Sequence, residues 1–199
     1  MFTTPLTSRV ASLAGRLLDA VIPGAEAHCD TDGGPTVGAG RRALRTGNLN
    51  HALPWVPADA VNELQDVFDT AVRVRTLSPE AAEVADRLFL ETLVRLHRMG
   101  EGVGFTGIRG PEARVEPVVV AADRALATGN LEPLRRLVPP GRFAELARRF
   151  AEARAKRDFP VDDVEAGRDF IAAYVAYVKF AEDDEHEHQH RHEHEPVHA

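Results

Sequence analysis

At 199 residues with 44% hydrophobic residues, the chain is long enough for one globular domain, or for two small halves that share a core. Its formal net charge is −7, but residues 181–199 carry seven acids and one arginine, so the rest of the chain is close to neutral. That balance argues against a nucleic-acid-binding surface, and no apolar run reaches the roughly 18 residues that a membrane span needs. A local basic run at residues 148–157 is interleaved with acids, which indicates a solvated helix face.

Residues 1–27 predict an N-terminal amphipathic helix. Leu13, Leu17 and Val21 recur at helical spacing. Ala25-Glu26-Ala27 has the form of a signal-peptide cleavage site, but Arg16 interrupts the apolar core that an export signal requires. We therefore expect a retained helix in a cytoplasmic protein. Export, with a cut after Ala27, is the alternative.

The chain then repeats itself at an offset of 82 residues. Residues 42–49 read RALRTGNL and return at 124–131 as RALATGNL. The register continues without a gap for roughly 55 residues, which favours a tandem duplication with copies at about 42–99 and 124–181.

Each copy has the same predicted elements. A short helix ends at Gly47 or Gly129, because glycine suits the left-handed position that closes a helix. A long helix with apolar residues at helical spacing follows, and then a second long helix. In the first copy this second helix starts after Ser78, a good N-terminal cap, and ends near Gly100; in the second copy we expect it over 160–180.

These elements predict an all-α fold. Two helix pairs, residues 57–99 and 139–181, should form an antiparallel helical bundle and superpose about an approximate two-fold axis. The bundle as a whole is expected to span residues 28–181.

Residues 182–199 predict a disordered tail rich in histidine and glutamate, because such a composition cannot bury a core. Imidazoles alternate with carboxylates, and this pattern suits divalent nickel, zinc, cobalt or copper. The tail ligands are His186, His188, His190, His192 and His194. A charged tail that only increases solubility is the alternative.

A second candidate metal site begins at His28, Cys29 and Asp30, three potential ligands in a turn-rich segment. The alternative is a capping aspartate beside a passive cysteine and histidine. The chain has a single cysteine, so an intrachain disulfide is excluded.

Comparing the two copies adds candidate functional residues, because residues that only the fold needs should recur in both copies. His51, Trp55, Glu91 and His97 occur only in the first copy. Glu91 lies four residues from two arginines, which predicts an ion pair on the helix surface.

His97 lies on the apolar side of its helix, and Glu101 follows one turn later. We predict that the 28–30 segment folds back onto this helix end. His28, Cys29, Asp30, His97 and Glu101 would then form one site. If they stay apart, His97 is an ordinary core histidine.

Residues 27–35 (AHCDTDGGP) and 91–102 (ETLVRLHRMGEG) resemble a bacterial family of unknown function. The resemblance covers Ala27 to about Leu137 and extends to the second copy. In that family the His-Cys-Asp segment often follows an export signal, whereas the leader here is less apolar. The family has no established activity, so the resemblance implies no named reaction.

The His-Cys-Asp tripeptide is also similar to the mature N-terminus of nickel superoxide dismutase, a small helical bundle. The similarity covers three residues. Gly33 stands where that enzyme has its second cysteine. The similarity therefore implies no dismutase activity and leaves room for a mononuclear thiolate site.

Three hypotheses about function follow. The first is a helical protein that binds a transition metal through the His/Cys/Asp site, with a metalloenzyme as one form of it. The second is a metal buffer or delivery protein that acts through the tail. The third is a structural interaction module. Metal ions are the expected partners, and homo-oligomers are left open.

Overall fold

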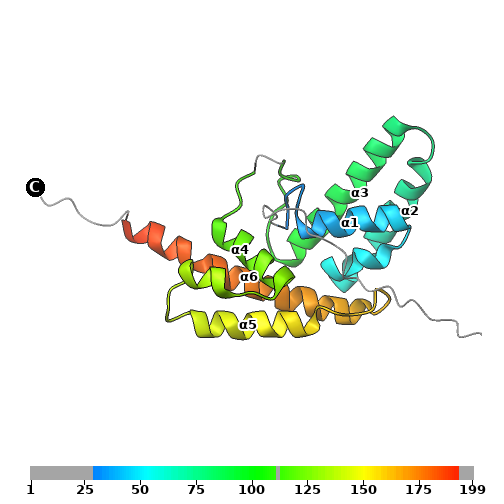
Figure 1. The fold of residues 1–199 in the computed structure, drawn as a ribbon. Helices are drawn as coiled ribbons and strands as arrows, with labels where there is room; N and C mark the ends of the chain where they lie inside the picture. The colour runs from blue at the N-terminus through cyan, green and yellow to red at the C-terminus, as the bar shows by residue number, and fades with distance from the viewer. Residues whose placement is uncertain (1–28, 111–112, 193–199) are drawn as a thin grey trace, which may run out of the picture.

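The computed structural model describes residues 29–110 and 113–192, with side chains as far as Glu182, and it is all-α (Figure 1). Within these residues there is no strand, and Thr31 and Arg109 form an isolated β-bridge. The helices of the first half are α1 (Pro35–Thr46), η2 (Leu49–His51), η3 (Leu53–Trp55), η4 (Ala58–Ala60), α2 (Val61–Val74) and α3 (Pro79–Gly100). Those of the second half are α4 (Pro117–Thr128), η5 (Glu132–Arg136), α5 (Phe143–Lys156) and α6 (Val164–His192).

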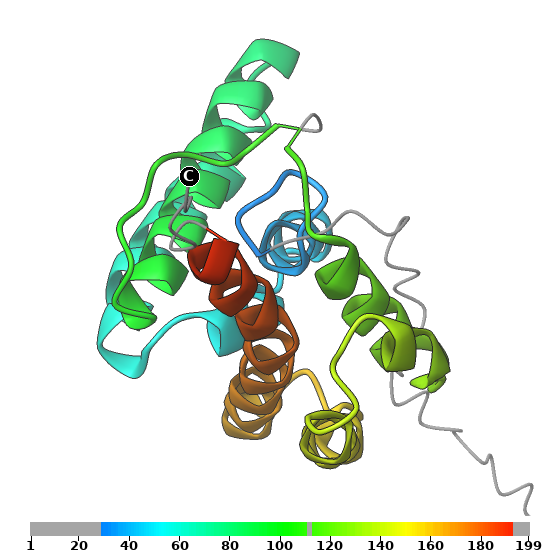
Figure 2. The same cartoon turned by 90° about the vertical axis from the view of Figure 1, so that its left-hand side faces the viewer.

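The helices are arranged as two groups of three. In the first half α2 and α3 pack side by side and α1 packs on α3; in the second half α5 packs on α6 and so does α4. Figures 1 and 2 show that the α2–α3 pair crosses the α5–α6 pair steeply. The two groups meet where η3 of the first half packs against α6 of the second.

Buried faces at helical spacing explain why these segments are helices. In α2, Leu64, Phe68 and Ala71 are buried, and Phe68 packs against Phe89 of α3 with ring centroids 5.2 Å apart. Full burial of a leucine side chain such as Leu64 stabilises the fold by about 1.5–3 kcal/mol. Each long helix thus buries one row of side chains, and these rows hold the two long helices of each half together.

The predicted offset of 82 residues recurs in the helix bounds. It carries α1 onto α4 and α2 onto α5, residue for residue. Gly47 and Gly129, which close α1 and α4, have φ values of 67° and 79°, as expected for left-handed caps. A tandem duplication is our interpretation of this recurrence.

Individual hydrogen bonds recur at the same offset. Arg75 Nη1 donates to the carbonyl of Leu44 at 2.6 Å, and the equivalent Arg157 Nη1 donates to Leu126 at 2.9 Å. Each arginine ties the end of a long helix to the short helix that precedes it. These two arginines therefore have the same structural role in the two halves.

The second long helices differ at their starts. Ser78 accepts from the N–H of Ala81 and caps α3, as predicted. The equivalent residue before α6 is Pro160, whose side chain has no acceptor, so α6 begins later than expected, and Asp163 accepts from the N–H of Ala166.

The end of α6 also differs from expectation. The helix runs through His192, so the backbone of residues 182–192 is helical, where the sequence predicts a disordered tail. The side chains from residue 183 onward lie outside the description, as do all of residues 1–28 and 193–199. Metal binding by the tail, and the N-terminal amphipathic helix, stay predictions.

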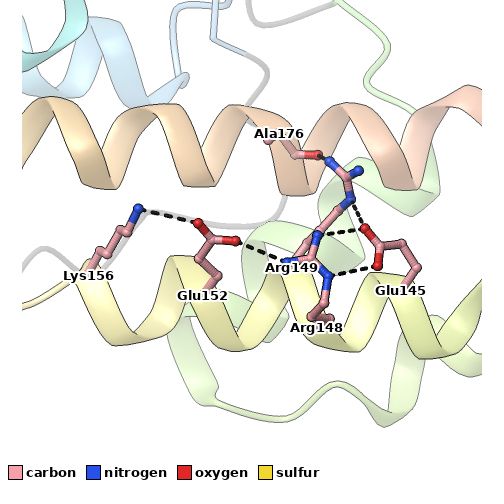
Figure 3. A network of polar contacts seen from close by, with 6 residues as sticks. All are labelled: Glu145, Arg148, Arg149, Glu152, Lys156 and Ala176. Carbon is pink, nitrogen blue, oxygen red and sulfur yellow. Dashed lines mark hydrogen bonds and ion pairs between the residues drawn. The ribbon is translucent and has the colours of Figure 1, made fainter.

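The basic run is the outer face of α5. Arg148 pairs with Glu145 at 2.8 Å and with Glu152 at 3.4 Å, and Lys156 also pairs with Glu152 (Figure 3). Arg149 donates to the carbonyl of Ala176 on α6. This is a solvated face, as predicted, and exposed ion pairs of this kind add little to stability.

Among the described residues, no helix is both long enough and apolar enough to cross a membrane.

Candidate functional site

The segment that follows Cys29 pairs with the loop after α3. The N–H of Arg109 donates to the carbonyl of Asp30 at 2.9 Å, and the N–H of Asp32 donates to the carbonyl of Arg109 at 2.8 Å. The guanidinium of Arg109 also donates to Asp30 Oδ1 through Nε and Nη2. Asp30 therefore fixes this segment in place through Arg109, a partner that the sequence reasoning did not foresee.

His97 is buried on α3, with 4% of its surface exposed. Its Nδ1 lies 2.9 Å from the carbonyl oxygen of Trp55, and because a carbonyl only accepts, Nδ1 must carry the proton. Burial is the main cause of a lowered His97 pKa, and it outweighs the opposing effect of the Glu101 charge. The imidazole is therefore neutral near pH 7, with the lone pair on Nε2.

That lone pair faces a carboxylate. His97 Nε2 is buried and has no hydrogen-bond partner among the described residues, and it lies 3.8 Å from Glu101 Oε2. Both atoms are acceptors, because Nε2 carries a lone pair and Oε2 belongs to a carboxylate. They therefore do not form a hydrogen bond with each other. An acceptor left without a partner in the interior is costly, so it needs an explanation.

Glu101 lies where the two halves meet. Lys179 Nζ from α6 is 3.0 Å from its Oε1, and Arg98 Nη1 is 3.2 Å from its Oε2. Positions 97 and 179 are equivalent under the 82-residue offset, and both approach this one side chain, which is only 11% exposed. The carboxylate is thus shared by the two halves.

Cys29 packs against the core, partly buried. Burial is the largest cause of a raised pKa of its thiol, followed by the charges of Glu101, Asp123 and Asp30, while Arg98 acts in the opposite direction. The thiol is therefore protonated at neutral pH.

Asp123 of α4 and Tyr174 of α6 complete the buried polar cluster. The hydroxyl of Tyr174 donates to Asp123 Oδ1 at 2.7 Å, and burial together with this carboxylate raises the Tyr174 pKa well above its usual value. The Trp55 ring makes edge contacts with His97 and with Tyr174, at centroid distances of 5.5 and 6.0 Å. Trp55 therefore joins the histidine to the aspartate–tyrosine pair.

The sequence reasoning missed Asp123 and Tyr174, although the sequence contains a signal for both. Under the 82-residue offset they replace Arg41 and Thr92 of the first copy. The comparison of copies that singled out His97 identifies them too when it is applied at these positions.

The predicted site residues are only partly brought together. His97 lies beside Glu101, while Asp30 is held by Arg109. Cys29 is related to Glu101 only through the effect of that charge on the pKa of its thiol. His28 and His194 lie outside the described residues, and His186, His188, His190 and His192 are described by backbone alone. Within the described side chains, no group of three or more histidine, cysteine, aspartate or glutamate residues has the arrangement of a metal site.

Glu91, in contrast, is a surface residue, as predicted. It pairs with Arg87 one turn away, with Nε and Oε1 2.9 Å apart. It takes no part in the buried cluster.

Comparison with known proteins adds a family but no activity. Residues 33–180 match the family of unknown function DUF6448. The chain belongs to this family. The match spans both halves of the DUF6448 fold and the buried cluster, except for the 29–32 segment. Neither the curated proteins nor the solved structures give a match.

Proposed function

We propose that this DUF6448 protein binds one divalent transition metal ion at the buried cluster, with His97, Glu101 and Cys29 as ligands. The observation that carries the proposal is the open Nε2 of His97. The sequence candidates for the metal are nickel, zinc, cobalt and copper.

The hydrogen bond made by His97 supports this proposal. Metal-ligating histidines usually donate the N–H of the other ring nitrogen to a carbonyl or carboxylate, which fixes the tautomer and the ring orientation. Here the Trp55 carbonyl accepts from Nδ1. Bonds of about 2.0–2.2 Å place two ligand atoms roughly 3–4 Å apart, and Nε2 lies 3.8 Å from Glu101 Oε2. This pair needs little movement to hold one ion.

Cys29 is the third ligand in this proposal. A metal ion would replace the thiol proton, and the carboxylates that disfavour the thiolate would favour a cation. Binding has two costs. The thiol must lose its proton, and Glu101 must exchange Lys179 or Arg98 for the metal. Affinity should therefore increase with pH. His28 as a further ligand remains a sequence prediction.

The test is a calorimetric zinc titration of the full-length chain in which the six tail histidines are replaced by glutamine. The replaced residues are His186, His188, His190, His192, His194 and His198. We expect one site per chain to survive these replacements. His97→Gln should weaken binding by about tenfold or more, whereas His51→Gln, the matched control on η2, should not change it.

A metal buffer that acts through the tail is the competing explanation. In that case all binding disappears when the tail histidines are replaced, and His97→Gln has no effect in the natural chain. Equal affinities of His97→Gln and His51→Gln would also refute the buried centre.

A further inference from the structure

A cleft of about 420 Å³ adjoins the buried cluster and shares Trp55, Asp123 and Tyr174 with it. Its walls are α1, the η2–η3 segment and the chain from Arg157 into α6, so both halves contribute to it. The volume falls within the range of small-molecule sites, roughly 300–1,000 Å³. His97, Glu101 and Cys29 do not line it.

The floor of the cleft is a continuous row of aromatic rings. Phe159 contacts Phe170 with centroids 5.8 Å apart, Phe170 contacts Tyr174 at 6.2 Å, and Tyr174 contacts Trp55 at 6.0 Å. All four residues line the cleft. Such a surface favours a flat apolar body over a fully hydrated ion.

One wall of the cleft is cationic. Arg42 and Arg45 both line it, and among the described residues neither forms an ion pair. By contrast, Arg41 is paired with Asp32, and Arg157 donates to the carbonyl of Leu126. Arg42 and Arg45 are therefore the guanidinium groups available to a ligand.

His51, at the end of η2, also lines the cleft. Its Nδ1 is buried without a hydrogen-bond partner among the described residues. Burial lowers the His51 pKa first, then the charges of Arg42 and Arg45, with Asp162 acting in the opposite direction. The imidazole is therefore neutral near pH 7 and can donate one hydrogen bond. His51, Arg42 and Arg45 all line the same cleft.

The acids around the cleft are mostly engaged. Asp32 pairs with Arg41, Asp123 accepts from Tyr174, and Asp162 accepts from the side chain of Asn50. Asp158 is exposed at the rim. Hydrogen bonds from neutral donors do not cancel a carboxylate charge, but four arginines and three aspartates line the cleft, so its formal net charge is +1.

We propose that this cleft binds a small organic anion, whose apolar, preferably aromatic, body lies on the ring floor and whose carboxylate or sulfonate contacts Arg42, Arg45 and His51. A guanidinium group can bind two oxygens of a carboxylate or of a tetrahedral oxyanion through two parallel hydrogen bonds, and an apolar body matches the floor. The proposal goes beyond metal binding and does not require it.

The test uses the full-length protein in chelator, so that no metal contributes. The probe is 1-anilinonaphthalene-8-sulfonate, with N-phenyl-1-naphthylamine as its uncharged analogue. Trp55 is the only tryptophan and lines the cleft, so quenching of its fluorescence reports binding at this site. We expect saturable quenching by the anion at one site per chain. The uncharged analogue should bind about tenfold or more weakly.

The role of the two charges is tested by the double variant Arg42→Gln, Arg45→Gln. It should weaken binding of the anion by about tenfold or more and leave binding of the uncharged analogue unchanged. Arg124→Gln is the matched control, because Arg124 is equivalent to Arg42 in the second copy but is exposed and outside the cleft. Equal affinity for the two probes in the natural protein would overturn the proposal, even if the double variant failed to fold. Equal anion affinity in the double variant and the control would overturn it too.

Discussion

Cys29 is the only cysteine of the chain, and its surroundings oppose the thiolate. Alkylation requires the thiolate. In metal-free native protein, iodoacetamide at about pH 8 should therefore modify Cys29 at least about tenfold more slowly than in the urea-unfolded chain. Mass spectrometry of quenched samples measures both rates. Equal rates would show that the thiol is neither buried nor held protonated.

Lys179 offers a test of Glu101 as a ligand. Its ammonium lies 3.0 Å from Oε1 of that carboxylate, so it competes with a metal ion for the negative charge of Glu101. Lys179→Met should raise the metal affinity a few-fold, a modest change because the lysine side chain is half exposed. The control is Lys156→Met, which removes the only other lysine from the distant surface of α5.

A zinc affinity that stays the same or falls in Lys179→Met would exclude Glu101 from the ligands. The calorimetric titration used for His97 gives the answer, since both variants keep the tail replacements.

At the scale of single residues, helical spacing was enough to predict that His97 is buried and that Glu101 lies one turn away. It could not supply the Trp55 carbonyl, because this contact joins residues 42 positions apart. Nor could it supply Arg109, which meets Asp30 across 79 positions. Contacts of this range depend on how helices pack, and a single sequence contains no direct record of that packing.

At the scale of elements, α1 shows how one missing side chain sets a packing distance. A Cβ on Gly40 would lie 2.6 Å from Leu90 and 2.8 Å from Leu93 of α3, whereas a Cβ on Gly38 would meet nothing within 4 Å. Gly40→Ala should therefore lower the free energy of unfolding by about 1–3 kcal/mol. Gly38→Ala should raise it by about 0.5–1 kcal/mol, because alanine favours a helix over the unfolded chain.

Urea unfolding followed by circular dichroism measures both variants. If Gly40→Ala were as stable as Gly38→Ala, the claim that α1 approaches α3 closely at Gly40 would be contradicted.

The elements themselves were largely predictable. The caps at Ser78, Gly47 and Gly129 are local chemistry, and the structure has each of them where the sequence predicts it. The start of α6 was not predicted, because the loss of a capping side chain at Pro160 shifts the cap to Asp163. The short turns η2 to η4 leave no periodic pattern, so the sequence predicts only one short segment that runs to Val56-Pro57, where the structure has separate short turns.

At the scale of the whole molecule, the two halves meet through an ion pair and a ring contact, and Asn50 donates a hydrogen bond to Asp162. Lys179 reaches Glu101, Trp55 packs on Tyr174, and the cleft opens beside them. The repeat in the sequence predicts two similar halves but not the face on which they meet. A metal centre here would tie the 29–32 segment and the end of α3 together at that junction.

Cobalt absorption spectroscopy tests the buried centre most directly. Cobalt(II) bound by a thiolate gives a near-ultraviolet charge-transfer band, and a soft thiolate ligand suits this ion. In the full-length chain with the tail histidines replaced, the band can come only from Cys29. We predict that it saturates at one cobalt per chain, vanishes in Cys29→Ser and weakens strongly in His97→Gln. A chain that binds cobalt without this band, or gives it undiminished in His97→Gln, would contradict a centre built from Cys29, His97 and Glu101.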